Sequence, residues 1–337
     1  MGANGTVEAA TAREEDSVDH GHHSGMWVPD QPPTWARMFL PHLDAWSVLA
    51  VLSIVGLVVY LGAVVRLRRS GVAWPWWRVL AWVGGTASLF AVTGTWLNGY
   101  SMVLFSVHMA QHMVLSLITP LLLLLAAPVT LALRTLPRGN GAAGAARALL
   151  LNGLHSRFAR FLAAPLFSIP LFIASLYGVY FTPLFDALMS NPVGHQVMLA
   201  HFVVTGLLFF GPIVAQDPWP RTLSHPGRML ELFLPVPFHA FFGVAIMMAG
   251  SLVVDTFANP PAGWGIDPLR DQGEAGGIVW AFGELPTVLV LAVVFFSWAS
   301  SDDRRAKAMD RTADRTGDAE LVAYNARLRA LAARPDS

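Results

Sequence analysis

Long apolar runs alternate with short polar stretches along most of this chain. Seven runs are long enough to be candidate membrane spans, at about 46–65, 77–97, 102–133, 165–181, 193–215, 229–254 and 276–299. A helix needs roughly 20 predominantly apolar residues to cross a bilayer, and the fourth run is the shortest. The pattern predicts an all-α polytopic membrane protein, with a seven-transmembrane-helix bundle over residues 46–300.

The basic residues follow the same alternation. Of the 22 lysines and arginines, all but Arg13, Arg37 and Arg270 fall between spans one and two, three and four, or five and six, or after span seven. Cytoplasmic loops carry an excess of Lys and Arg. This bias predicts an N-terminus outside the cell and a cytoplasmic C-terminus. It also supports the span number, because six or eight spans would destroy the alternation.

The regions outside the predicted spans are polar. Residues 1–45 are acidic and include His20, His22 and His23, which predicts a mostly disordered extracytoplasmic tail that either scavenges copper or zinc or is simply solvated. The Gly/Ala/Arg-rich loop at 135–161 suits a short interfacial helix. Residues 301–337 form a charged cytoplasmic tail, and a solvated helix is favoured there over one bound to anionic lipid.

Composition narrows the chemistry. Only 13% of residues are charged, against roughly a quarter in soluble domains, and zero net charge gives no indication of nucleic-acid binding. The chain has no cysteine, so disulfides, thiolate metal sites and cysteine nucleophiles are excluded. No nucleotide, phosphate-cradling or serine-hydrolase motif is present. Outside the predicted spans, we expect Asp217, Asp255 and Asp271 to be loop and cap residues.

Polar side chains inside apolar spans are costly and therefore informative. His108 and His112 are four residues apart in the third span, on one helix face, and further histidines lie in spans five and six. Imidazole binds copper, zinc and iron, and thioether selects Cu(I). The candidate metal ligands, in what we expect to be the outer half of the membrane, are His108, His112, His201, His239, Met109, Met113 and Met247.

Other interpretations of these residues remain open. A buried histidine in a membrane helix is often an interhelical hydrogen-bonder, and methionines often only pack. Histidines on different helices can also ligate a b-type haem. A zinc hydrolase using His108, His112 and Glu284 is disfavoured, because such a pair usually has a carboxylate beside it and residues 109–111 supply none. A metal-free scaffold is the remaining alternative.

Four segments resemble one family. SVHMAQHMVLSLITPLLLLLAAPVTLALR (106–134), HFVVTGLLFFGPIVAQDPWPRTLSHPGRML (201–230), PFHAFFGVAIM (237–247) and DQGEAGGIVWAFGELP (271–286) are similar to the caa3-type cytochrome c oxidase assembly factors, often called CtaG. These motifs fall in spans three, five, six and seven. The resemblance covers roughly residues 45–300 and is carried by the combination of motifs rather than by any single one.

The resemblance implies a seven-span factor of a bacterial cell membrane that assembles haem-copper oxidase. Its usual proposed role is copper delivery to the binuclear centre of oxidase subunit I. The family's recurrent histidines match His108, His112, His201 and His239. We therefore expect a chaperone or insertion factor rather than an enzyme. We expect it to bind Cu(I), with oxidase subunits and the lipid bilayer as partners and an extracytoplasmic copper donor.

Overall fold

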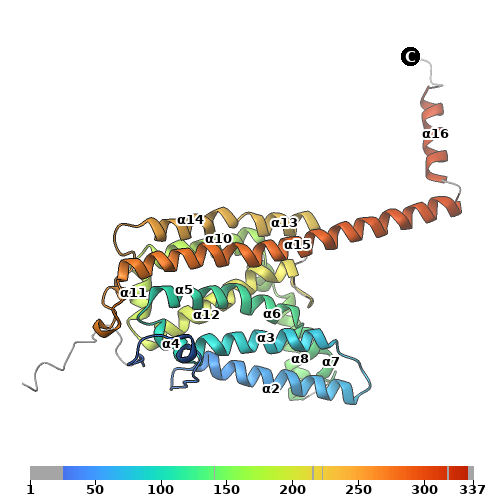
Figure 1. The fold of residues 1–337 in the computed structure, drawn as a ribbon. Coiled ribbons are helices and arrows are strands. Elements are labelled where there is room, and N and C mark those ends of the chain that lie inside the picture. The colour runs from blue at the N-terminus through green and yellow to red at the C-terminus, as the bar shows by residue number, and fades with distance from the viewer. Residues whose placement is uncertain (1–25, 140, 215, 222, 317–318, 333–337) are drawn as a thin grey trace, which may run out of the picture.

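The bundle is elongated, and its helices lie lengthwise beside one another (Figure 1). This computed structural model describes residues 26–139, 141–214, 216–221, 223–316 and 319–332. Within these ranges there is no β-strand, only an isolated bridge between Pro41 and Thr95. The all-α prediction is confirmed.

Four predicted spans correspond to single helices. They are α2 (Val48–Arg69), α3 (Trp76–Thr93), α10 (Pro165–Tyr180) and α12 (Pro192–Val214). The observed bounds lie within about four residues of the predicted ones. Arg66, Arg68 and Arg69 form the last turn of α2, where charged side chains favour water over hydrocarbon.

The third predicted span is a broken helix. It consists of α5 (Phe105–Met113), the π-helical turn η2 (Val114–Ile118), α6 (Thr119–Leu125) and α7 (Pro128–Thr135). Pro120 lacks an amide hydrogen and so cannot donate to the carbonyl four residues earlier, which suits a widened turn just before it. Ala127 has a left-handed backbone, with φ of 53°, and separates α6 from α7. The π turn directly follows His112 and Met113.

The last two predicted spans also differ from simple helices. Span six is divided at Leu234–Pro235 into α13 (His225–Phe233) and α14 (Val236–Met248). Span seven lies inside α15 (Pro268–Thr316), which continues well beyond residue 300. A further helix, α16 (Ala319–Ala332), follows it. Much of the predicted charged tail is therefore helical.

Short elements cover the two ends of the bundle (Figure 1). α1 (Trp35–Met38), α4 (Trp96–Tyr100), α11 (Leu184–Met189), η3 (Asp255–Phe257) and η4 (Ala262–Trp264) belong to the end that we call the N-terminal end. The opposite end, called the basic end for its arginines, carries α7, α8 (Ala142–His155) and α9 (Arg157–Leu162). α8 lies within the loop where an interfacial helix was predicted.

Residues 26–45 differ from the predicted disordered tail. The amide of His42 donates to the carbonyl of Gly94 at 2.9 Å, and the amide of Trp96 donates to the carbonyl of Leu40 at 2.9 Å. The Trp27 ring stacks on His42 with centroids 3.7 Å apart. Backbone pairing and aromatic contact thus fix this segment on the bundle. The more N-terminal His20, His22 and His23 lie outside the described residues.

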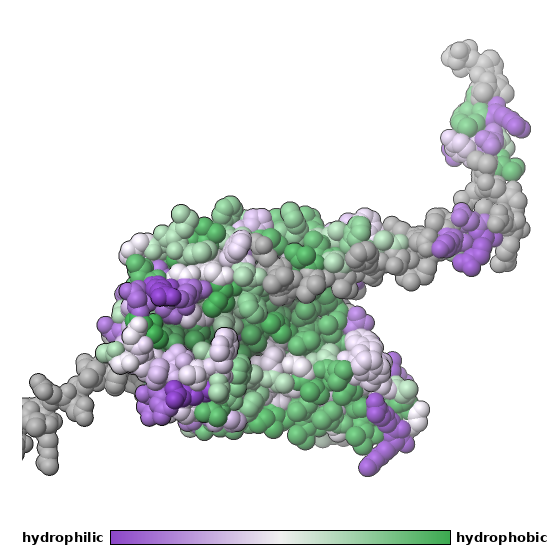
Figure 2. Space-filling model, viewed as in Figure 1, coloured by the Kyte–Doolittle hydropathy of each residue, from purple (hydrophilic) through white to green (hydrophobic). Residues whose placement is uncertain are grey.

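The bundle has the surface of a membrane protein. Hydrophobic residues cover much of its middle, and hydrophilic residues gather towards the ends (Figure 2). Four described segments are long and apolar enough to span a membrane, namely Val48–Arg69, Phe105–Thr135, Pro192–Val214 and His225–Met248, and Pro165–Tyr180 is a shorter apolar helix.

Two glycines bring α14 and α15 into close contact. A Cβ atom on Gly243 would lie 2.9 Å from the amide nitrogen of Trp280, and one on Gly276 would lie 2.7 Å from the carbonyl of Gly243. Small residues allow membrane helices to approach backbone to backbone. This contact fixes α15 beside α14 and so positions Asp271 and Gly283 relative to the histidines.

Candidate functional site

The helix that carries the histidine pair is held at its start by an aspartate from α15. Asp271 Oδ2 accepts hydrogen bonds from the amides of Phe105, at 2.6 Å, and Ser106, at 3.3 Å, and the Ser106 hydroxyl donates to Asp271 Oδ1. Burial raises the pKa of the Asp271 carboxyl, and the bonds from Ser106 and Phe105 oppose that rise. The prediction of a cap residue is confirmed, and this cap fixes where α5 begins.

His108 and His112 converge on one hydroxyl group. His108 Nε2 lies 3.0 Å from the Tyr180 hydroxyl oxygen, and His112 Nδ1 lies 2.9 Å from the same atom. All three side chains are buried. The hydroxyl has a single proton, so it donates to one imidazole and accepts from the other. Since both ring nitrogens contact this one oxygen, they lie less than about 6 Å apart.

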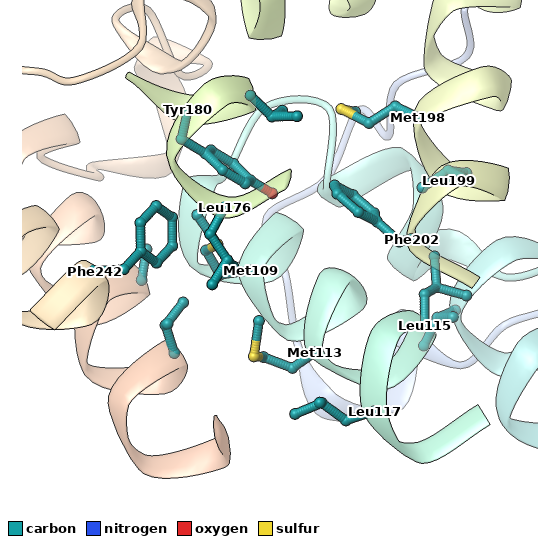
Figure 3. Close-up of a cluster of buried hydrophobic side chains, with 14 of the residues drawn as sticks. Met109, Met113, Leu115, Leu117, Leu176, Tyr180, Met198, Leu199, Phe202 and Phe242 are labelled. Carbon is teal, nitrogen blue, oxygen red and sulfur yellow. The ribbon is translucent and has the colours of Figure 1, made fainter. Parts of the chain in front are cut away.

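Aromatic rings enclose this pair. The His112 ring stacks on Phe202 with centroids 3.9 Å apart and an interplanar angle of 14°. The His108 ring meets Phe185 edge to face at 5.0 Å. Figure 3 shows the Tyr180 hydroxyl pointing into a region walled by hydrophobic side chains. In such low-dielectric surroundings each polar contact is stronger than in water, and an unpaired group is costly.

The predicted methionine ligands are in different surroundings. Met109 and Met113 are fully buried in the hydrophobic core, among the side chains drawn in Figure 3. Met247 in α14 is 41% exposed, at the surface of the bundle. Of the three thioethers, only the first two share the enclosed region of α5.

His201 has its own hydroxyl partner. Its Nε2 lies 2.8 Å from Ser175 Oγ in α10, with Thr205 Oγ1 at 3.5 Å. The Ser175 hydroxyl donates to the carbonyl of Leu171 at 2.7 Å. Since that bond uses its single proton, Ser175 accepts from His201. This is an interhelical hydrogen bond of the kind weighed above as an alternative to metal ligation.

His239 is packed against the backbone of α15. It is 5% exposed, and its Nδ1 has no hydrogen-bond partner among the described residues. A Cβ atom on Gly283 would collide with that nitrogen. His239 also lines a cavity of about 20 Å³ with Leu117, Phe172, Phe209 and Thr287, which is enough space for about one water molecule.

The four histidines are therefore divided between three separate arrangements. Within the described part of the chain, no three His, Asp or Glu side chains form a group that could hold a metal ion. The side chain of Glu284, named above for a zinc hydrolase, lies outside the described residues. The structure therefore contains one pair of imidazoles, His108 and His112, which converge on the Tyr180 hydroxyl. His201 and His239 each lie apart from this pair, with different neighbours.

The sequence patterns did not single out Tyr180, Ser175 or Glu231. Glu231 is buried in α13, where its Oε1 accepts from the Ser168 hydroxyl at 3.1 Å and its Oε2 has no partner among the described residues. A lone glutamate in an apolar run is a usable signal. Tyr180 and Ser175 gave none, because neither residue type is unusual in a membrane helix.

Helical segments with buried polar side chains and an apolar exterior define a polytopic membrane protein. This chain belongs to the cytochrome c oxidase caa3 assembly factor family, whose model matches residues 58–301. The family resemblance is thereby confirmed. Membership supports a role in oxidase assembly.

Several curated proteins are similar to this chain. Uncharacterized proteins of Mycobacterium bovis and Mycobacterium tuberculosis are each 44% identical over 309 residues, covering 89% of this chain and 46% of the relative. An uncharacterized protein of Mycobacterium leprae is 39% identical over 307 residues, with the same coverage. The chain thus spans about half the length of the curated relatives it matches. No solved structure matches it.

Proposed function

We propose that this chain assists the assembly of a cytochrome c oxidase from within a bacterial plasma membrane, as a seven-span bundle with its N-terminus outside. The family supports the assembly role. The segregation of basic residues supports the orientation. The helices α3, α10 and the first part of α15 lie beside the four long apolar segments, which supports seven spans. In this orientation the N-terminal end faces outwards and the basic end faces the cytoplasm.

The finer proposal is that His108 and His112 take up Cu(I) transiently. The observation that carries it is the convergence of their nitrogens on the Tyr180 hydroxyl. Imidazole nitrogens bind such metals at about 2 Å, so an ion between two of them needs a nitrogen–nitrogen separation of about 4 Å. The pair is less than about 6 Å apart, and an ion would replace the hydroxyl after a small movement of Tyr180.

A site already occupied by a weak partner suits transfer better than a closed cage. Met109 and Met113 are buried thioethers on the same helix as the pair, and thioethers favour Cu(I). His201, His239 and Met247 are further ligands in this proposal, met as the ion leaves the pair. The client is an oxidase subunit, with subunit I as the first candidate because its copper centre also lies within the membrane.

The test is Cu(I) titration of the purified protein under anaerobic conditions, against a competing chromogenic chelator. We expect His108→Ala/His112→Ala to lose the Cu(I) equivalent held by the histidine pair, and Ser175→Ala, which alters only the partner of His201, to retain it. Unchanged binding in the double variant would overturn the ligand assignment. A Soret band in the purified protein would instead favour the haem alternative.

A second experiment separates delivery from scaffolding. In a strain whose own gene is replaced by the double variant, copper and subunit content of the oxidase are measured together. An assembled but copper-depleted oxidase supports delivery. An oxidase that fails to assemble, although the variant is stable and present at the wild-type level, supports a metal-free scaffold.

A further inference from the structure

A second cavity, with several polar residues in its walls, lies at the N-terminal end of the bundle, apart from the histidine pair. Its volume is about 20 Å³, and its walls include Met26, His42, Asn98, Met102, His195 and Gln196. We infer that this cavity is a loading site for Cu(I), where the ion binds before it reaches His108 and His112. The inference rests on the proposed function, since it names an additional site for the same cargo.

The donor atoms around the cavity match a soft monovalent cation. Two thioethers and two imidazoles line one space that holds about one water molecule or ion. Thioether sulfur selects Cu(I), and imidazole also binds copper. The donors come from three parts of the chain, with Met26 and His42 from the N-terminal segment, Met102 from the turn before α5 and His195 from the first turn of α12.

The N-terminal segment holds its donors in place. The ring of His42 is stacked on Trp27 at 3.7 Å with an interplanar angle of 21°. The backbone of His42 is hydrogen-bonded to Gly94. Asp44 lies on the exposed rim of the cavity and supplies a negative charge that attracts cations. Residues 26–45 thus complete a site that the helices alone would leave open.

One wall of the cavity carries an unsatisfied oxygen. Gln196 Oε1 is buried and has no hydrogen-bond partner among the described residues. Leaving a buried acceptor unpaired is destabilising. A polar occupant therefore stabilises the cavity, and the candidates are a bound cation with its remaining water, or a water molecule alone.

A hydrogen bond joins the cavity wall to the helix of the histidine pair. Asn98 Oδ1 accepts from Gln111 Nε2 at 2.9 Å. Gln111 is fully buried in α5, between His108 and His112 in sequence. This hydrogen bond links the wall of the loading site to the helix of the histidine pair, with the cavity at the N-terminal end and the pair deeper in the bundle. A short transfer along α5 follows from this placement.

The experiment is anaerobic Cu(I) titration of the full-length protein, with Ag(I) as a redox-inert analogue. Met26→Leu/Met102→Leu removes both thioethers at nearly constant volume. His42→Phe removes the imidazole while keeping a ring to stack on Trp27. We expect two Cu(I) equivalents in the wild type, one in the double Met variant and one in His108→Ala/His112→Ala. The matched control, Met189→Leu in the core at α11, keeps two.

The outcomes separate this site from the deeper one. If the double Met variant and His42→Phe both retain the wild-type stoichiometry and affinity, the loading site is refuted and the cavity holds water. If the wild type binds one equivalent that only His108→Ala/His112→Ala removes, the proposed function stands without a loading site. If only the outer variants lose copper, the loading site stands and the assignment to His108 and His112 fails.

Loading kinetics provide an independent measurement. With the outer donors removed, we expect filling of the histidine pair to slow at least tenfold, on the order of a 1.4 kcal/mol higher barrier, while the final occupancy of the pair is unchanged. Filling at the wild-type rate would show that copper reaches the pair by another route.

Discussion

His108 and His112 are buried as deeply as His239, yet the histidines have different surroundings. The pair on α5 meets at a single oxygen of Tyr180, His201 pairs with Ser175 from the same helix as Tyr180, and His239 lies against the bare backbone at Gly283. All four are histidines, and His108, His112 and His239 are all buried while His201 is partly buried, so neither residue type nor depth explains why the pair and His239 differ.

The difference comes from spacing and from the partner helix. Two histidines four residues apart lie on one helix face, so one side chain from α10 can contact both. His201 and His239 lie on separate helices and have no companion at that spacing. A convergent pair can exchange its hydroxyl for an ion held by two imidazoles, whereas under the proposed function His201 and His239 each supply only a single further ligand.

The largest expected effect is on the packing of His239. Gly283→Leu places a side chain where the His239 ring lies, and overpacking of this kind costs about 3 kcal/mol. We expect a strongly lowered thermal unfolding temperature in detergent. Gly277→Leu is the control, because a Cβ there meets nothing within 4 Å. Equal melting of the two variants would show that the ring moves aside freely.

Tyr180→Phe tests the histidine pair with two readouts of opposite sign. Losing the hydroxyl leaves two buried imidazole nitrogens without that partner, so we expect a loss of about 2 kcal/mol in stability. Under the proposed function Cu(I) affinity rises, because the competing group is gone. The control is Tyr177→Phe, whose hydroxyl donates to the carbonyl of Phe238 at an exposed position. Weaker copper binding in Tyr180→Phe would show that Cu(I) does not bind by displacing the Tyr180 hydroxyl.

Asp271→Asn tests whether the α5 cap positions the pair. We expect a loss of about 1 kcal/mol and weaker Cu(I) binding, since α5 would shift at its start. Asp267→Asn alters an exposed cap on α15, where Asp267 Oδ1 accepts from the amide of Arg270, and serves as the control. Thermal unfolding and copper titration are measured on both. If Asp271→Asn binds copper with wild-type affinity, the cap does not position the histidine pair.

The smallest expected effect concerns His201. Ser175→Ala removes one neutral hydrogen bond, and Thr205 Oγ1 remains at 3.5 Å from the imidazole. Double-mutant cycles for such bonds between membrane helices average about 0.6 kcal/mol. Thermal unfolding should shift slightly and copper binding should not change. Loss of copper binding in Ser175→Ala would show that His201 belongs to the same metal site as His108 and His112.

Much of the helical fold of this protein can be predicted from the pattern of apolar residues alone. Backbone groups in hydrocarbon must be satisfied within a helix, so the runs at 46–65 and 193–215 predict α2 and α12 closely. The breaks at Pro120 and Pro128 follow from proline's missing amide hydrogen. The pairing of His108 with His112 on one face follows from the helical repeat. These features depend on local geometry and on the solvent, both of which the sequence specifies.

The tertiary structure decided which side chains meet across helices. Nothing local to α5 indicates that Tyr180 contacts both histidines, that Asp271 caps the helix from 166 residues away, or that residues 26–45 close a cavity. Lipid tails are as apolar as the helix faces, so hydrophobicity does not select the partners of a helix within the membrane. Close approach at glycines such as Gly276, and hydrogen bonds between helices, make that selection.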